Sequence, residues 1–213
     1  MGRDRSHHRL SPKVSYIVSA FDRPTSLPCC LWSLKVQSDP SFEVIVADNA
    51  LREGLQLRHA LAVRQLDDPR FRHVDTSNPA NCSWDCYWSA EWLVTHGRVK
   101  GEWICCPSDD SYYVPIFQEA LLDAAGKNGW DLVYSDMLYD RRIGGVYKKL
   151  DVEPRRNWID KTGFLVKRKH WIGFPEKPTT GPQRSSCDGA MIDQLVASGI
   201  KHGKVPEILV VHN

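Results

Sequence analysis

Two adjacent carboxylates follow a short apolar run in the middle of this sequence. The run Trp103-Ile104-Cys105-Cys106 is typical of a buried strand, and Ser108-Asp109-Asp110 follows it after one proline. Ligands of open α/β sheets bind outside the carboxyl ends of the strands, so the acids stand where a site is expected. Carboxylates hold Mg²⁺ or Mn²⁺ while substrate phosphates complete the coordination. The motif therefore predicts a metal that meets a diphosphate, and its plain alternative is a solvated turn.

Two further residues near the end of the sequence are candidates for catalysis or metal binding. Asp188 lies in Cys187-Asp188-Gly189, directly before a stretch of helical apolar spacing. It is placed either to cap that helix or to act as a general base that takes a proton from an acceptor hydroxyl. His212 ends the apolar run 205–211, and a neutral imidazole there can join a carboxylate on a metal.

Short apolar runs alternate with helical patterns along the chain, which indicates an α/β fold with parallel pairing. No GxGxxG or P-loop sequence is present, so the two commonest nucleotide-binding loops are not supported.

Gly144-Gly145 is typical of a hairpin turn. The three tryptophans Trp84, Trp88 and Trp92 are expected in the core. The predicted strands are 14–19, 43–47, 71–74, 103–106, 132–135 and 205–211, and the predicted helices are 27–36, 55–63, 83–96, 116–125 and the stretch after Asp188.

Composition limits the class of protein. With 213 residues, 42% hydrophobic and 25% charged, the chain suits one sizeable globular domain with a small appended lobe. It has no apolar run of about 18 residues, and Met1 to Lys13 lacks the apolar core of a signal peptide, so we expect a soluble cytoplasmic protein. Seven cysteines, with Cys82 and Cys86 as the nearest approach to a zinc motif, indicate reduced thiols.

Positive charge is concentrated in one part of the chain. Residues 141–170 hold ten Lys or Arg and three acids, about +7, so the remainder must be about −5 to give the total of +2. This segment is either a solvated face or attracts an anion, such as a diphosphate, a phosphorylated acceptor or a nucleic acid backbone. Trp158 and Trp171 lie among these charges and would suit stacking on a base or a sugar.

Five motifs, in order, resemble those of family 2 glycosyltransferases of the GT-A type. They are 14–24 (VSYIVSAFDRP), 47–49 (ADN), 108–115, 187–189 (CDG) and 205–212 (VPEILVVH), and the resemblance covers the chain from about residue 13 to its end. It implies a Rossmann-like, mostly parallel central sheet with helices on both faces and a small acceptor-side lobe. It also implies a flexible tail at 1–12 and a single domain at 13–213, in which 13–136 bind the nucleotide-sugar and 137–213 the acceptor.

The resemblance also implies roles for single residues. Asp109 and Asp110 fall on the metal-binding motif, with Asp110 the direct ligand and His212 a late one, and Asp188 falls on the catalytic base. Two departures from the family pattern are Cys187, where an acid precedes the base, and Pro107, where many relatives have an acid. The implied donor-binding residues are Ser19, Ala20, Asp22, Arg23, Asp48, Asn49, Ser108 and Asp109, with Asp48 on the base.

The implied activity is a metal-dependent, inverting transfer from a nucleoside diphosphate sugar, with a UDP-sugar favoured, to an acceptor hydroxyl. Trp158, Asp160 and Lys161 are the expected acceptor-side residues. The acceptor is a sugar or other small molecule, or a hydroxymethylated pyrimidine in DNA as modified by virus-encoded enzymes, which would act in the host cytoplasm. A nucleotidyltransferase and a non-catalytic nucleotide-sugar binding module are the alternative classes.

Overall fold

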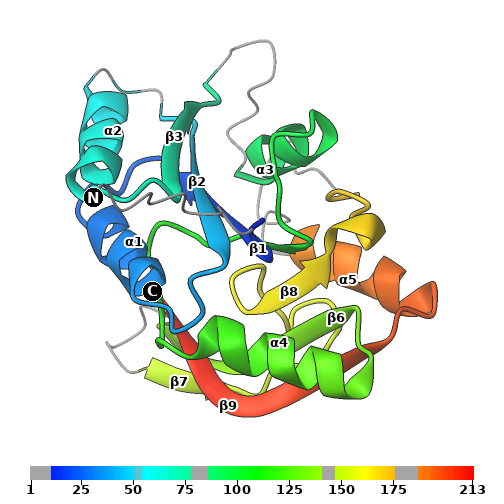
Figure 1. The fold of residues 1–213 in the computed structure, drawn as a ribbon. Coiled ribbons are helices and arrows are strands. Elements are labelled where there is room, and N and C mark those ends of the chain that lie inside the picture. Colours follow the sequence, from blue (N-terminus) through cyan, green and yellow to red (C-terminus); the bar gives the residue numbers. More distant parts are fainter. Residues whose placement is uncertain (1–10, 51, 53, 78–85, 141–146, 176–186) are drawn as a thin grey trace, which may run out of the picture.

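The computed structural model describes residues 11–50, 52, 54–77, 86–140, 147–175 and 187–213. Within these residues, nine strands form one sheet in the order β3-β2-β1-β4-β8-β6-β9-β5, and β7 pairs with β6 beside this path (Figure 1). The strands are β1 (Val14–Ala20), β2 (Phe42–Asp48), β3 (Phe71–Asp75), β4 (Trp103–Cys105), β5 (Ser111–Tyr113), β6 (Leu132–Asp140), β7 (Tyr147–Leu150), β8 (Phe164–Lys167) and β9 (His202–His212).

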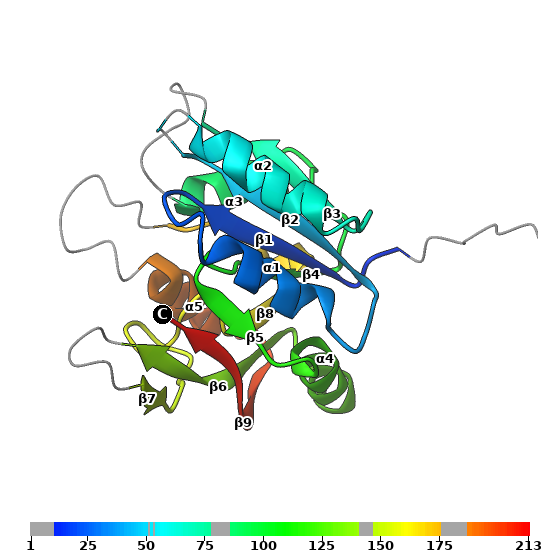
Figure 2. The ribbon, with the colours of Figure 1, turned by 90° about the vertical axis from the view of Figure 1, so that its left-hand side faces the viewer.

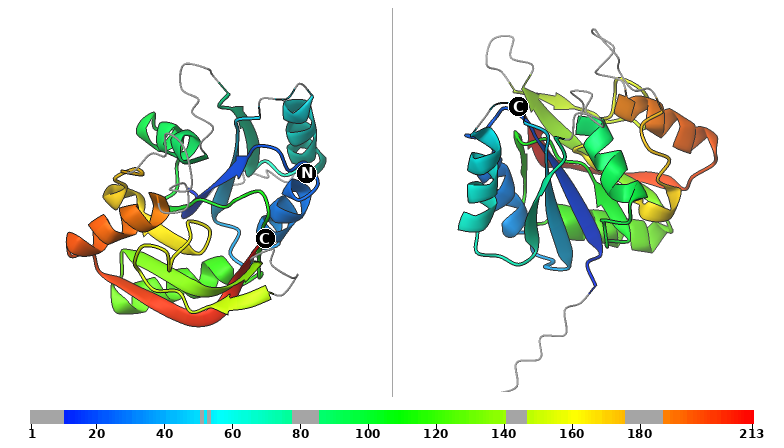
Figure 3. Two further views of the ribbon diagram at one scale, coloured as in Figure 1. Left: turned by 180° about the vertical axis from the view of Figure 1, so that it is seen from behind. Right: turned by 90° about the horizontal axis from the view of Figure 1, so that it is seen from above.

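Five α-helices accompany the sheet in the described residues. Helices α1 and α2 lie on one face of β1, β2 and β3, and α3 lies on the other face (Figures 1 and 3). Helix α4 packs against β6 and β9. The helices are α1 (Leu27–Lys35), α2 (Leu55–Gln65), α3 (Cys86–Thr95), α4 (Phe117–Asn128) and α5 (Cys187–Ala197), and the short 3-10 helix η1 (Arg168–His170) follows β8.

Strands β3, β2, β1 and β4 are parallel neighbours. Every residue of β1 and β2 is buried, because helices cover both faces, which explains their continuous apolar sequences. Gly101 precedes β4, and a Cβ atom there would lie 2.4 Å from the backbone nitrogen of Ser15. Only glycine allows β4 to begin this close to β1. Because the two strands are parallel neighbours, their carboxyl ends lie at the same edge of the sheet.

The second half of the chain extends the same sheet. Strand β8 pairs antiparallel with β4 and β6, whereas β6 pairs in parallel with β9, which curves beneath the molecule to reach β5 (Figure 2). The pairing of β6 with β9 shifts by two residues at Pro206-Glu207, because proline cannot donate to the ladder, and a bulge there bends the strand. The predicted α/β fold with a mostly parallel central sheet is confirmed.

Some expectations need revision or fall outside the described residues. Strands β5, β7 and β8 were not predicted, because each has only three or four residues and is defined by its pairing partner. The hairpin glycines 144–145, Trp84, Cys82 and the start of helix 83–96 lie outside the described residues. Trp92 is half-buried against the core, as expected. None of the helices described here has the length and hydropathy to cross a membrane.

Candidate active site

The acid pair lies beyond the carboxyl ends of β1 and β4. The backbone N–H of Ser19 donates to the carbonyl of Pro107 at 2.9 Å, and Ser19 and Ser108 form a parallel bridge that extends the pairing of the two strands. The backbone N–H of Phe21 then donates to Oδ2 of Asp109 at 3.3 Å. The loops after β1 and β4 are therefore held together directly at the acids, at the sheet edge predicted from sequence.

Asp109 and Asp110 are both 3% exposed, and Arg23 from the loop after β1 contacts both. Its Nη1 atom donates a hydrogen bond to Oδ1 of Asp109 at 3.2 Å. The same atom forms an ion pair with Oδ2 of Asp110 at 2.6 Å, although the angles of this contact are not those of a hydrogen bond. Burial raises the pKa of Asp109, the charge of Asp110 raises it further, and Arg23 opposes both effects. The pair therefore requires a nearby positive charge.

The carboxylate of Asp110 fits a divalent cation. Both its oxygens are buried and have no hydrogen-bond partner among the described residues, and such buried acceptors are costly unless a ligand or ion satisfies them. No group of three or more His, Cys, Asp or Glu in the described ranges could hold a metal alone. Mg²⁺ and Mn²⁺ suit an arrangement of one or two carboxylates completed by phosphate oxygens and water.

His212 lies beside this pair as part of β9, where it pairs with Ser111 and Tyr139. Its Nδ1 is 3.6 Å from Oδ1 of Asp110 and 3.1 Å from the hydroxyl of Ser111. Its Nε2 is 4.0 Å from Oδ2 of Asp160. The imidazole therefore lies between the predicted metal site and Asp160, an acid expected on the acceptor side.

Asp188 is 4% exposed and lies in the first turn of α5. Its Oδ2 accepts a hydrogen bond from the backbone N–H of Lys161, and its Oδ1 accepts one from Gly189, both at 2.9 Å. Burial raises its pKa from an ordinary 3.8 to about 7, and the negative charge of Asp160 adds to the effect. A carboxylate with this pKa is matched to general base catalysis near neutral pH.

Two of the three expected acceptor-side residues belong to this cluster. Asp160 is held by Thr162, whose N–H and hydroxyl donate to its Oδ1 at 2.9 and 2.8 Å. Although burial opposes it, the positive charges of His212 and Lys161 lower the pKa of Asp160. The buried ammonium of Lys161 donates to the carbonyl of Cys106 at 3.2 Å. Trp158 is instead 41% exposed and packs against the guanidinium of Arg155.

Four of the expected donor-side residues lie at the ends of β1 and β2, namely Ser19, Ala20, Asp48 and Asn49. The backbone N–H of Asn49 donates to the carbonyl of Ala20 at 3.1 Å, which joins the two strand ends. The hydroxyl of Ser19 and Oδ1 of Asn49 are buried without a hydrogen-bond partner among the described residues, and such atoms are normally satisfied by a ligand or water. Asp22 is exposed and lies 3.7 Å from Arg52.

Asp48, the residue expected to contact the donor base, has no exposed surface. Its Oδ1 accepts from the N–H of Ala50 at 2.9 Å, and its Oδ2 lies 2.9 Å from Nδ1 of His59 and 2.8 Å from Nε2 of His73. Burial alone would raise its pKa, but the hydrogen bonds of His59, His73 and Ala50 lower it to about 2. The two histidines were not predicted, although His59 falls on the buried face of helix α2 together with Val63, which is a signal in the sequence.

Most of the positive charge of residues 147–170 is neutralised within the protein. Lys149 pairs with Asp136, and Lys167 and Lys169 pair with Asp131 at 2.7 and 3.1 Å. Arg155 pairs with Glu153, and Arg156 with Asp193. These contacts favour a structural role for much of the basic segment.

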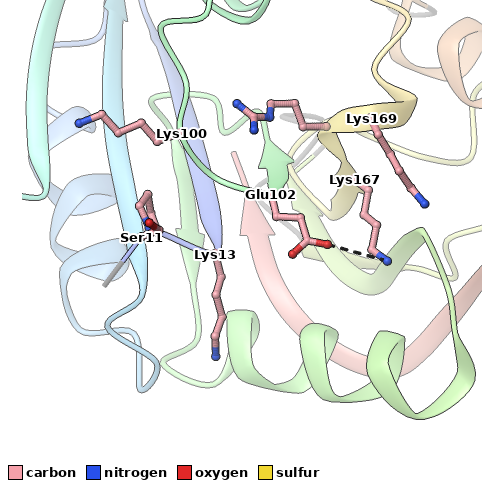
Figure 4. A pocket seen from close by; sticks show the side chains of 8 residues that line it. Ser11, Lys13, Lys100, Glu102, Lys167 and Lys169 are labelled. Atoms are coloured by element: carbon pink, nitrogen blue, oxygen red, sulfur yellow. Dashed lines mark ion pairs between the residues drawn. The ribbon is translucent and has the colours of Figure 1, made fainter. Parts of the chain in front are cut away.

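A basic hollow of about 580 Å³ lies at the opposite end of the sheet from the acid pair. It is lined by residues 11–13 before β1, by Lys100 and Glu102 before β4, and by residues 167–169 at the end of β8 and after it. Figure 4 shows the side chains of Lys100 and Lys169 pointing away from each other and Lys167 turned toward Glu102. The hollow is therefore separate from the candidate active site.

Comparison with known proteins identifies the fold. No protein-family model matches the chain, and no curated protein matches it. Among solved structures, residues 1–349 of S. aureus TarS in complex with UDP-GlcNAc match 93% of this chain at 15% identity with a TM-score of 0.68. The mannosyltransferase PcManGT from Pyrobaculum calidifontis, in complex with GDP-Man and Mn²⁺, matches 95% at 16% identity with a TM-score of 0.71.

The chain spans 58% of that TarS structure, 57% of PcManGT and 36% of a longer TarS structure. At 15–16% sequence identity, the structural similarity establishes the fold alone. This is the fold that the order of the sequence motifs predicts. The candidate site lies at the edge of the sheet where open α/β folds bind ligands. The chain therefore has the GT-A glycosyltransferase fold.

Proposed function

We propose that this chain is a glycosyltransferase that moves a sugar from a nucleoside diphosphate sugar to an acceptor hydroxyl, with inversion at the anomeric carbon. The observation that carries the proposal is the placement of two acid centres in one cluster of a GT-A fold. Asp110 has a buried carboxylate without hydrogen-bond partners, and Asp188 has a raised pKa. His212 and Asp160 connect the two. Residues 13–136 would bind the donor and 137–213 the acceptor.

The donor half supplies binding and electrostatic stabilisation. Asp110, with Asp109 and His212 beside it, would hold Mn²⁺ or Mg²⁺, whose charge stabilises the departing nucleoside diphosphate. Ser19 and Asn49 offer buried polar atoms at the strand ends to the nucleotide. The PcManGT complex with GDP-Man and Mn²⁺ supports this combination of donor and metal.

The acceptor half supplies the base. The N–H groups of Lys161 and Gly189 hold the carboxylate of Asp188 in one orientation. Asp188 would take the proton of the acceptor hydroxyl while that oxygen bonds to the anomeric carbon and the bond to the diphosphate breaks on the opposite face. A single displacement inverts the configuration and requires no covalent intermediate, so no nucleophile is assigned.

The donor base is left open in this proposal. The preference for a UDP-sugar rests on contact between Asp48 and the base. Both oxygens of Asp48 are already engaged, and the side chain is fully buried. A direct contact would require these bonds to break, so uridine and guanosine nucleotides both have to be tested.

The acceptor is proposed only as a hydroxyl compound. A DNA acceptor was an alternative suggested by the basic segment, but the described cations of that segment are largely paired with acids. The hollow that Lys167, Arg168 and Lys169 line lies at the other end of the sheet. No observation therefore favours DNA over a carbohydrate or another small molecule. A reducing compartment such as the cytoplasm suits the free thiols of Cys29, Cys30 and Cys105.

Thermal melting with nucleoside diphosphates tests the proposal. We expect UDP or GDP with Mn²⁺ to raise the melting temperature of the wild-type protein, because a ligand that binds only the native state stabilises it. Asp110→Asn should abolish the metal-dependent part of this shift. Asp123→Asn is the matched control, since Asp123 is an exposed acid on α4. Absence of any nucleotide-dependent shift, with or without metal, contradicts the proposal.

A further inference from the structure

Arg23 contacts both acids of the predicted metal site. We propose that Arg23 is the resident counter-ion of the pair Asp109 and Asp110, that it competes with the divalent cation for Asp110, and that it turns to the diphosphate when donor and metal bind together. The inference rests on the proposed function and assigns to Arg23 the control of metal affinity.

The guanidinium lies against an oxygen that the proposed metal would use. Its Nη1 atom lies 2.6 Å from Oδ2 of Asp110 and 3.2 Å from Oδ1 of Asp109. A divalent cation on Oδ2 would stand about 2.0–2.2 Å from that oxygen. The guanidinium nitrogen and the metal would then lie no more than about 4.8 Å apart, and two positive charges at that separation repel strongly in a buried site. Arg23 and the metal therefore compete for Asp110.

Electrostatics explain why the guanidinium of Arg23 is held at Asp109 and Asp110 when no metal is bound. Two neighbouring carboxylates, each 3% exposed, cannot both remain charged without compensation. In the described part of the chain, Arg23 and His212 are the basic side chains within 4.0 Å of these acids. Arg23 is the permanently charged one of the two, because a guanidinium does not lose its proton in proteins.

Arg23 has both the freedom and the chemistry to serve a second partner. Its side chain is 48% exposed, so the guanidinium can leave the acids without crossing the core. It belongs to the loop between β1 and α1, on the same edge of the sheet as the unpartnered Ser19 hydroxyl. Arginine presents a planar fork of donors that matches phosphate oxygens in pairs. A diphosphate beside Asp110 is therefore a suitable new partner.

A specific binding behaviour follows from this exchange. Metal alone must displace Arg23 from Asp110 and so remove one of its two anionic partners, which weakens the binding of metal alone. With a nucleoside diphosphate present, the displaced guanidinium gains a phosphate partner. Each ligand then increases the affinity for the other by the same factor, as linkage requires.

The test is direct measurement of Mn²⁺ binding, for example from the electron paramagnetic resonance signal of unbound Mn²⁺, with and without UDP or GDP. Arg23→Gln removes the charge, and we expect it to bind Mn²⁺ alone about tenfold tighter than the wild type. The enhancement of Mn²⁺ affinity by nucleotide should fall toward unity. Arg23→Lys keeps the charge without the fork, so it should bind Mn²⁺ alone as weakly as the wild type but show less enhancement by nucleotide.

Two controls separate failure of this inference from failure of the proposed function. Arg64→Gln makes the same charge change on the exposed surface of α2 and should leave Mn²⁺ binding unchanged. Asp110→Asn should abolish Mn²⁺ binding in the wild-type and Arg23→Gln backgrounds. If the wild type binds Mn²⁺ with nucleotide and Arg23→Gln binds the metal alone no tighter, the inference on Arg23 is wrong. If no variant binds Mn²⁺ under any condition, the metal site and the inference both fail.

Discussion

The charge of Asp160 contributes to the pH at which Asp188 becomes a base, and Asp160→Asn tests this directly. The asparagine retains an oxygen that can accept the two hydrogen bonds from Thr162, so the substitution removes charge while keeping the local hydrogen bonds. The pKa of Asp188 rises from 3.8 to about 7, a difference worth on the order of 4 kcal/mol. Burial is the larger cause and Asp160 the second. Removing Asp160 should therefore lower the pKa of Asp188 by about one pH unit.

The assay is the pH dependence of nucleoside diphosphate release from a nucleotide sugar, expressed as kcat/KM. A base acts in its deprotonated form, so the wild-type rate should rise with pH and reach half its maximum near pH 7. In Asp160→Asn the midpoint should lie near pH 6, which raises the rate at pH 6 about fivefold and leaves the rate at pH 9 nearly unchanged. A midpoint that stays near pH 7 would refute the role of Asp160, and Asp123→Asn on α4 provides the control for charge alone.

Two substitutions test the packing around the site, and a third on α4 serves as their control. Asp48→Asn removes a buried carboxylate with two histidine partners and should lower the free energy of unfolding by about 2–3 kcal/mol at pH 7. The folded pKa of Asp48 lies below its ordinary value, so this stabilisation is present above about pH 4 and disappears as pH falls through 2. Denaturation at pH 7 and at pH 3 should therefore show different losses of unfolding free energy in Asp48→Asn. Equal losses at the two pH values would contradict the linkage. Gly189→Ala places a Cβ atom 2.6 Å from Cα of Arg156 and should cost about 1–3 kcal/mol in urea denaturation. Gly126→Ala on α4 meets no atom within 4 Å and should instead stabilise by about 0.5–1 kcal/mol, and a loss as large as that of Gly189→Ala would contradict the packing argument.

The parts of the fold that the sequence predicts are those with a strong local signal. Strands β1 and β2 are buried along their whole length, and their apolar runs match this environment closely. Strand β7 shows the opposite case, because Tyr147–Leu150 is largely exposed and carries two lysines. Its conformation depends on pairing with β6, and the local sequence pattern does not predict that contact.

The candidate site divides in the same way. The position of Asp109 and Asp110 at a strand end follows from the sequence, because the preceding apolar run fixes where the strand stops. The ion pair with Arg23 joins residues 86 positions apart, and the contact between Asp48 and His73 joins residues 25 apart. Such contacts depend on strand order, so the burial of Asp48 could not be predicted from the residue itself.

The most direct test of the central claim is the release of nucleoside diphosphate from a nucleotide sugar by the wild type, Asp110→Asn and Asp188→Asn. UDP-GlcNAc and GDP-Man, each with Mn²⁺, are the donors to begin with. The wild type should release nucleoside diphosphate from at least one of them. Asp188→Asn should lose about a hundredfold to ten-thousandfold in rate while it still binds nucleotide, and Asp110→Asn should lose metal-dependent turnover. Nucleotide binding without turnover in the wild type, or turnover that neither substitution reduces, would contradict the account.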